Sequence, residues 1–296
     1  MIELLTPGAY TTVQDLGRKG HEIYGMPPSG AFDAYLASLA NLIAGNNVNA
    51  AVLEFALAGP SLRFHADTVA ALSAFGAVYL LNGSAVSGFR SFQAAAGSTL
   101  EFNGMQGWFG YLAFAGGLAV DLVLGSASTF VPGRIGKRLA KGDRLSAGAP
   151  AATTSELPQE AVPIGGRPVL QILPSIHTSL FAETSLRTLI SSEFRILPNS
   201  DRMAIALEGA IIPSPRVIRS APAFPGSIQA LPSGQLLLLG PEGPTTGGYP
   251  QIAHLSRASW TTLAQLKPGR AVRFEWITRE DARRRIEQRD AIFRRK

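Results

Sequence analysis

Strand-length apolar segments recur along most of this chain, and turn residues separate them about every ten residues. Strand-length apolar segments end at Gly59-Pro60, at Gly76 and at Asn82-Gly83, the last being a strong hairpin signal. Glycine turns at positions 97, 142 and 269 precede further strands. This pattern predicts a mainly β protein built as a barrel or sandwich, and not an alternating βα fold.

One segment has a different period. Between Phe32 and Ala44, apolar residues recur three and four positions apart, which is the spacing of an amphipathic helix. Ser29 or Asp33 can cap its start, and Gly45 with Asn46 ends it. A second helical pattern covers residues 179–189.

The composition changes between Ser146 and Gly166, where alanine, proline, serine and glycine replace the apolar pattern. We interpret this stretch as an interdomain linker, and a long surface loop inside one domain is the alternative. The predicted division is a first β domain at residues 1–148, a linker at 149–167 and a second β domain at 168–296 with a basic helical tail.

Composition excludes several classes of protein. With 46% hydrophobic and 16% charged residues among 296, the chain can bury a sizeable core and is not disordered. No apolar run reaches the roughly 18 residues of a membrane span, and no signal-peptide pattern is visible. The chain has no cysteine, which excludes disulfides, thiolate metal sites and a cysteine nucleophile. A cytoplasmic protein is expected.

The net charge of +6 is concentrated in the tail. Residues 279–296 hold eight basic and four acidic side chains, which is +4 of that total. Opposite charges four apart, such as Glu280 and Arg284, indicate a solvated helix and not a nucleic-acid-binding surface.

The chain lacks the common motifs of phosphate-binding loops, serine-nucleophile elbows and zinc proteases. Its four histidines are dispersed, so no metal site is predicted. Three glycine-rich stretches, at residues 12–33, 116–139 and 243–250, nonetheless concentrate polar side chains. Hydroxyls beside paired glycines suit recognition of a carboxylate or carbonyl group, and tight-turn chemistry is the alternative interpretation.

These stretches, taken in order, resemble the allophanate hydrolase subunit 2 family, whose members include the carboxyltransferase-like domain of urea carboxylase, the C-type subunit of oxoprolinase and a kinase-inhibitor antagonist. The resemblance covers nearly the whole chain. It is carried by Thr12-Val13-Gln14-Asp15-Leu16-Gly17-Arg18, Ser29-Gly30-Ala31 with Asp33, Leu53-Glu54, Tyr111-Leu112-Ala113, Ser128-Thr129, Ser200-Asp201-Arg202-Met203, Gly226-Ser227-Ile228-Gln229 and Thr245-Thr246-Gly247-Gly248-Tyr249-Pro250. It implies two cyclophilin-like β-barrel domains with a few short helices.

The resemblance also implies a function. The chain is expected to be the C-type subunit of a bacterial ATP-dependent 5-oxoprolinase, which opens 5-oxoproline to glutamate together with a subunit-one (B-type) protein and an A-type subunit. ATP is expected to be bound by the complex, and the chain is not expected to be active alone. One alternative is carboxyl transfer from biotin to urea or another small amide, with biotin carried elsewhere because this chain has no Met-Lys-Met site. Another is a non-catalytic antagonist of a kinase inhibitor.

The implied site residues fall into two roles. The catalytic candidates are Asp15, Glu54, Glu242 and Thr246. The substrate-binding candidates are Gln14, Arg18, Ser29, Asp33, Arg202, Gln229, Thr245, Gly247, Gly248 and Tyr249.

Five positions depart from the family pattern. Phe109 and Ala206 stand where the family has arginine, Ala204 replaces a glycine, Glu242 an aspartate and Pro244 a glutamine. Because proline has no polar side chain, Pro244 removes one polar contact, and the two missing arginines weaken a carboxylate clamp.

Overall fold

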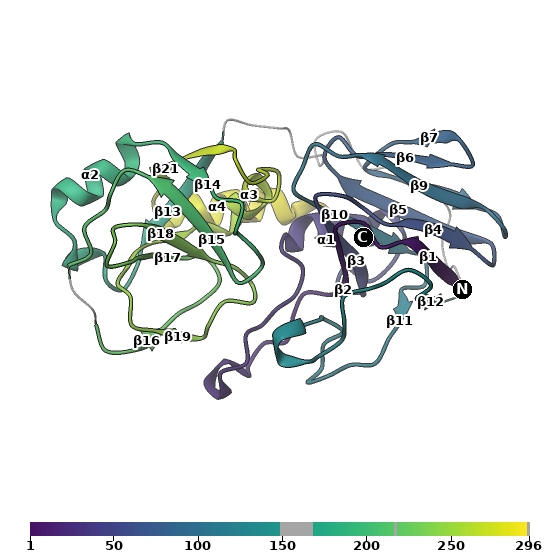
Figure 1. Ribbon diagram of the computed structural model, residues 1–296, viewed down its shortest axis with the longest axis horizontal. Coiled ribbons are helices and arrows are strands. Elements are labelled where there is room, and N and C mark those ends of the chain that lie inside the picture. Colours follow the sequence, from purple (N-terminus) through teal and green to yellow (C-terminus); the bar gives the residue numbers. More distant parts are fainter. Residues whose placement is uncertain (149–167, 216–217, 295–296) are drawn as a thin grey trace. The chain divides into compact units, whose positions relative to one another are not determined.

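The computed structural model describes residues 1–148, 168–215 and 218–294, and the chain forms two compact units (Figure 1). Residues 1–18 and 29–148 belong to the first unit. Residues 19–28, 168–215 and 218–294 belong to the second. The predicted linker at 149–167 lies outside the described residues, and so do Arg295 and Lys296 of the predicted tail.

The first unit contains two antiparallel sheets and confirms a mainly β fold. One has seven strands in the order β11-β12-β1-β4-β9-β6-β7, and the other has five in the order β2-β3-β10-β5-β8. The strands are β1 (Ile2–Thr6), β2 (Tyr10–Gln14), β3 (Val52–Ala56), β4 (Ser61–Phe64), β5 (Thr68–Ala74), β6 (Val78–Leu81), β7 (Ser84–Val86), β8 (Arg90–Ala94), β9 (Thr99–Gly104), β10 (Phe109–Phe114), β11 (Leu118–Ala119) and β12 (Arg144–Ala147). A short 3-10 helix, η2 (Val131–Gly133), follows β11.

The core of the first unit comes from alternate positions of these strands. Leu53 and Phe55 of β3, Leu72 of β5 and Phe114 of β10 point into it and are fully buried. The intervening residues of β3 and β10 are buried too, because helix α1 (Ala34–Ile43) packs on the other face of the five-stranded sheet. These central strands therefore have no solvent-facing side.

Helix α1 confirms the predicted helix at residues 32–44 and identifies its cap. Asp33 caps the start, since its Oδ1 accepts from the backbone N–H groups of Tyr35 (2.9 Å) and Leu36 (3.4 Å). Ser29, the other candidate cap, lies in the preceding loop with a left-handed backbone (φ 53°). The helix ends before Gly45, whose φ of 74° takes the chain out of the helical conformation.

The second unit is built around a closed barrel of seven strands in the order β13-β20-β17-β18-β15-β14-β21. The second unit is therefore a closed barrel. In the first unit, two separate sheets pack against each other through their side chains. The strands of the barrel and of a separate ribbon are β13 (Val169–Pro174), β14 (Phe194–Ile196), β15 (Ala204–Gly209), β16 (Ala221–Pro222), β17 (Ser227–Ala230), β18 (Leu236–Leu239), β19 (Thr246–Gly247), β20 (Gln251–Leu255) and β21 (Ala271–Trp276). β16 and β19 form the ribbon.

The helices of the second unit are short. They are η1 (Glu22–Tyr24), η4 (Thr178–Leu180), α2 (Glu183–Ser191), η5 (Arg257–Ser259), α3 (Trp260–Leu263), α4 (Arg279–Asp290) and η6 (Ala291–Arg294). The helix predicted at 179–189 begins later, because Phe181 and Ala182 adopt extended backbone angles. The charged tail forms α4, where Arg284 pairs with Asp281 and Arg283 with Glu287. No helix within the described residues is long and apolar enough to cross a membrane.

Tyr79 is a polar residue inside the core of the first unit. Its ring contacts Phe55 and Phe102 edge-on, and its hydroxyl has no hydrogen-bond partner among the described residues. Burial raises the pKa of the Tyr79 phenol well above its usual value of 10. The folded state therefore keeps the phenolic proton at a pH where the unfolded chain releases it, so this group reduces stability as the pH rises above 10.

We expect Tyr79→Phe to leave the free energy of unfolding at pH 7 unchanged or slightly higher, because no hydrogen bond is lost. Between pH 9 and 11 the variant should lose stability less steeply than the wild type. The difference approaches about 1.4 kcal/mol per pH unit above the tyrosine pKa of the unfolded chain. Urea unfolding at several pH values measures it, and parallel pH dependences would contradict the assignment.

Candidate functional site

A row of buried polar side chains crosses the five-stranded sheet of the first unit. Thr12 of β2 pairs with Glu54 of β3, Glu54 with Tyr111 of β10, and Tyr111 with Ser73 of β5. These residues alternate with core residues, so they point to the face that α1 covers. All four are at most 2% exposed, so water does not hydrate their polar groups, and among the described residues the Ser73 hydroxyl has no hydrogen-bond partner.

Glu54 links this row to the start of α1. Its Oε2 accepts from the Phe32 backbone N–H (2.6 Å) and from the Tyr111 hydroxyl (2.9 Å). The same hydroxyl accepts from the Asp33 N–H at 2.7 Å. Burial, together with the negative charges of Glu54 and Asp33, raises the pKa of Tyr111 well above 10, so Tyr111 remains a hydrogen-bond donor to the carboxylate.

Asp15 holds together two loops of the first unit. Its carboxylate accepts from the Gly17 N–H (2.8 Å), the Ala127 N–H (2.8 Å) and the hydroxyls of Ser126 (2.6 Å) and Ser128. The Asp15 backbone adds an N–H bond to the Ser128 hydroxyl, and its carbonyl accepts from the Ala31 N–H. Asp15 therefore holds residues 15–17 against residues 126–128 and against Ala31.

Three further candidates lie in the same region. The Gln14 amide donates to the Thr12 hydroxyl (3.1 Å) and the Thr129 carbonyl (3.3 Å), and Arg18, 1% exposed, donates to the Ser128 carbonyl. Within the described residues, Gln14 Oε1 and Ser29 Oγ are buried without a hydrogen-bond partner. Unsatisfied buried atoms of this kind call for an explanation, and a bound ligand is one.

The loop that carries Ser29 is closed at its base. A Cβ on Gly30 would lie 2.8 Å from the Gly17 nitrogen, and Gly30 has a φ of 87°. Glycine is therefore required at position 30, both for its backbone angle and for this close approach.

An aromatic cluster stands beside the Glu54 network. Phe109, which departs from the family pattern, stacks on Phe32 with ring centroids 4.0 Å apart and planes 11° apart. Trp108 packs against both rings. The residues around the Phe32 N–H that binds Glu54 are thus apolar. The family pattern instead predicts an arginine at position 109.

The second unit contains a buried ion pair. Arg202 Nε donates to Glu242 Oε1 at 2.6 Å, and the two side chains are 5% and 6% exposed. The backbones are bonded as well, from the Glu242 N–H to the Arg202 carbonyl (3.0 Å). A Cβ on Gly240 would lie 2.1 Å from that carbonyl oxygen, so glycine permits this approach.

Gln229 lies beneath the glycines of the 243–250 stretch. It is 3% exposed, and its Nε2 has no hydrogen-bond partner among the described residues. A Cβ on Gly247 would lie 2.9 Å from this nitrogen, so the absence of a side chain there makes room for the amide. A register shift in the β17–β20 pairing falls at Gln229.

The rest of this stretch is more open. Thr246 and Tyr249 are exposed, Thr245, Gly247 and Gly248 are half-buried, and Pro244 is exposed. The Thr245 carbonyl accepts from the Ala223 N–H at 2.9 Å, which extends the β16–β19 ribbon. The departure from the family pattern at Pro244 therefore changes the exposed surface, whereas the Glu242 carboxylate lies inside and binds Arg202.

The candidates form two groups, each within its own unit. Gln14, Asp15, Arg18, Ser29, Asp33 and Glu54 belong to the first, and Arg202, Gln229, Glu242, Thr245, Thr246, Gly247, Gly248 and Tyr249 to the second. Sequence reasoning did not select Tyr111, Ser126 or Ser128 as site residues. The paired serines were visible in the glycine-rich second stretch, whereas nothing in the sequence places Tyr111 beside Glu54. Within the described residues, no three acidic or histidine side chains cluster as metal ligands.

The sequence and fold match known proteins. Residues 24–276 match the family described as carboxyltransferase domain, subdomain A and B, and the chain belongs to this family. The C-type subunit of the 5-oxoprolinase of Escherichia coli is 33% identical over 290 residues, which cover 95% of this chain and 93% of that protein. Its Haemophilus influenzae counterpart is 32% identical with the same coverage.

A solved structure has the same fold. The urea carboxylase of Kluyveromyces lactis superposes with a TM-score of 0.91 at 27% identity. The match covers 98% of this chain but 29% of the urea carboxylase chain, so the chain spans less than a third of that protein.

We expect the Arg202–Glu242 pair to stabilise the second unit only as a pair. Glu242→Leu leaves the guanidinium without this carboxylate and should lower the free energy of unfolding by about 3–5 kcal/mol. The double variant Arg202→Met, Glu242→Leu should recover most of that loss. Urea unfolding measures both effects, with Glu287→Leu in the exposed Arg283 pair as the control, expected to change stability by about 0.5 kcal/mol or less. A double variant as unstable as Glu242→Leu would contradict this.

Proposed function

We propose that this chain acts as the C-type subunit of an ATP-dependent 5-oxoprolinase, in which water hydrolyses the lactam C–N bond to give glutamate, driven by hydrolysis of ATP. The observation that carries the proposal is the match to the C-type subunits of two 5-oxoprolinases along 93% of their length. The urea carboxylase match extends over a much smaller share of that protein.

The second unit supplies groups that suit recognition of a lactam. Gln229 Nε2 is a buried donor without a partner among the described residues, and a lactam carbonyl is an acceptor of matching polarity. Gly247 places no side chain against this nitrogen, and Thr245, Thr246 and Tyr249 add hydroxyls at the more exposed end. In this proposal these residues bind and orient the substrate.

Glu242 and Arg202 have a positioning role in this proposal. Their side chains bind each other and their backbones are paired, so the pair fixes the start of the 243–250 stretch. The family difference at Glu242 is compatible with this role, because a carboxylate is retained.

In the first unit, Gln14 and Ser29 are the proposed substrate contacts. Both have a buried oxygen without a hydrogen-bond partner among the described residues. Asp15 and Glu54, the predicted catalytic carboxylates, each accept hydrogen bonds from backbone N–H groups and hydroxyls, so we assign them to positioning of the loops and of α1. Arg18 and Asp33 complete this framework.

The proposal requires partners. The chain contains no phosphate-binding motif, so ATP is proposed to bind within a complex that includes the B-type and A-type subunits. No nucleic acid or membrane takes part.

A second candidate function is carboxyl transfer to urea or a related small amide. The TM-score of 0.91 with the Kluyveromyces lactis urea carboxylase favours it. Biotin would then be needed, attached to a separate carrier domain, because this sequence has no Met-Lys-Met site. The same buried amide groups would serve a urea-like substrate.

The deciding experiment is an oxoproline-dependent ATPase assay on this chain copurified with its A-type and B-type partners. ATP hydrolysis coupled to glutamate formation should require this chain. Gln229→Leu and Thr246→Ala should each lower kcat/KM for 5-oxoproline by about tenfold, the size expected for one lost substrate hydrogen bond.

The matched control is Gln235→Leu, a glutamine of the same unit in the turn before β18, which should leave kcat/KM unchanged. ATP hydrolysis that needs urea, bicarbonate and a biotin carrier in place of 5-oxoproline would select the carboxyl-transfer function. A folded complex that is equally active without this chain would refute the proposal.

A further inference from the structure

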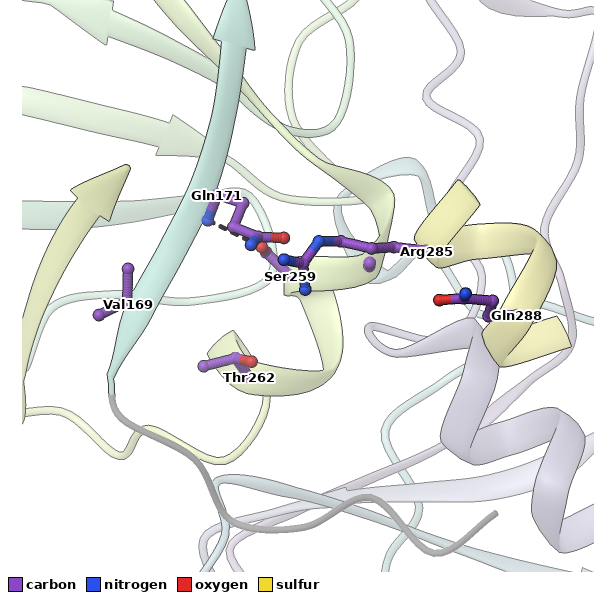
Figure 2. Close-up of a pocket in the computed structure, with 7 residues that line it drawn as sticks. Val169, Gln171, Ser259, Thr262, Arg285 and Gln288 are labelled. Atoms are coloured by element: carbon purple, nitrogen blue, oxygen red, sulfur yellow. Dashed lines mark hydrogen bonds between the residues drawn. The ribbon is translucent and has the colours of Figure 1, made fainter. Parts of the chain in front are cut away.

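A polar pocket of about 400 Å³ lies within the second unit, and none of the candidate residues above lines it. Strand β13 contributes Val169 and Gln171, the η5–α3 segment contributes Ser259 and Thr262, and α4 contributes Arg285 and Gln288. Figure 2 shows the Arg285 side chain extending from α4 toward Ser259 and Gln171.

The walls of this pocket are fixed by hydrogen bonds. The Gln171 N–H donates to the Ser259 hydroxyl at 2.9 Å, and the Gln171 carbonyl accepts from the Ser256 N–H at 2.8 Å. Arg289 of α4 donates to the Arg257 carbonyl at 3.2 Å, which ties α4 to η5. The pocket is therefore formed by connected elements and does not depend on a free loop.

The charge inside the pocket is positive, and no acidic residue lines it. On the same helix, Arg283, Arg284 and Arg289 each pair with a carboxylate. Within the described part of the chain, Arg285 forms no salt bridge, although its charge helps to lower the pKa of Asp281 one turn earlier on α4. Arg285 and Gln288 are exposed, and the side-chain amides of Gln171 and Gln288 make no hydrogen bond to described residues.

We propose that this pocket binds a small monocarboxylate, with the Arg285 guanidinium holding the carboxylate and the amides of Gln171 and Gln288 holding its remaining polar atoms. A planar guanidinium fork matches a carboxylate in geometry. One arginine also balances one negative charge, whereas a phosphate dianion would be only half neutralised. The volume lies within the range of small-molecule sites.

The test is a titration of the full chain with sodium lactate, observed through the side-chain amide signals of Gln171 and Gln288 in 1H–15N spectra at constant ionic strength. Lactate should shift both signals saturably, and sodium chloride should not. Arg285→Gln should weaken the binding by about tenfold or more, the cost of a lost charge-assisted contact.

Arg283→Gln is the matched control, because Arg283 lies on the same helix but outside the pocket. The affinity of this variant for lactate should stay within about twofold of the wild type. If Arg285→Gln fails to fold, Gln171→Leu replaces it, with binding followed at Gln288. The proposal would be overturned if Arg285→Gln and Arg283→Gln lost the same affinity for lactate, or if lactate caused no saturable shift of the two amide signals. Tighter binding of sodium phosphate at the same residues would also overturn the monocarboxylate assignment.

Discussion

The first unit depends on the buried carboxylate of Glu54. A charge on a sheet face that a helix covers loses its hydration, which costs several kcal/mol unless hydrogen bonds replace it. The Phe32 N–H and the Tyr111 hydroxyl provide that replacement, and Tyr111 also binds the Asp33 N–H. Because Asp33 caps α1, the position of the helix follows from the position of one carboxylate.

Buried carboxylates have different hydrogen-bond partners in the two units. In the first, Asp15 and Glu54 are satisfied by backbone N–H groups and hydroxyls, which fixes loops. In the second, Glu242 binds a guanidinium, which fixes the start of a glycine-rich turn. Each unit also contains a buried glutamine with one unsatisfied amide atom, Gln14 or Gln229. The satisfied groups fix loops and turns, and the two glutamines are the proposed substrate contacts.

Local features were predictable from the sequence, and features that join distant residues were not. The period of residues 32–44 and the capping chemistry of Asp33 are local, so α1 was predicted almost to the residue. The start of α2 was predicted too early, because the apolar spacing does not reveal the extended backbone at Phe181 and Ala182. The pairing of Arg202 with Glu242 joins residues 40 apart in the sequence, and that of Asp15 with Ser128 joins residues 113 apart. The residues of both groups could be selected by family resemblance, but their partners required the fold. The roles of these residues stay predictions, with Asp15, Glu54 and Glu242 proposed as positioning residues.

The barrel of the second unit is closed by a parallel pair, β13 with β21, which are its first and last strands along the chain. Chain synthesis runs in one direction, so β13 has no partner on that side until residues 271–276 have been made. Until then β13 and β14 both present unpaired edges, which are prone to join other chains. The first unit completes its sheets at β12, well before that point. Folding during translation is therefore ordered, with a first unit that can mature early and a second that stays open to misassembly until its last strand arrives.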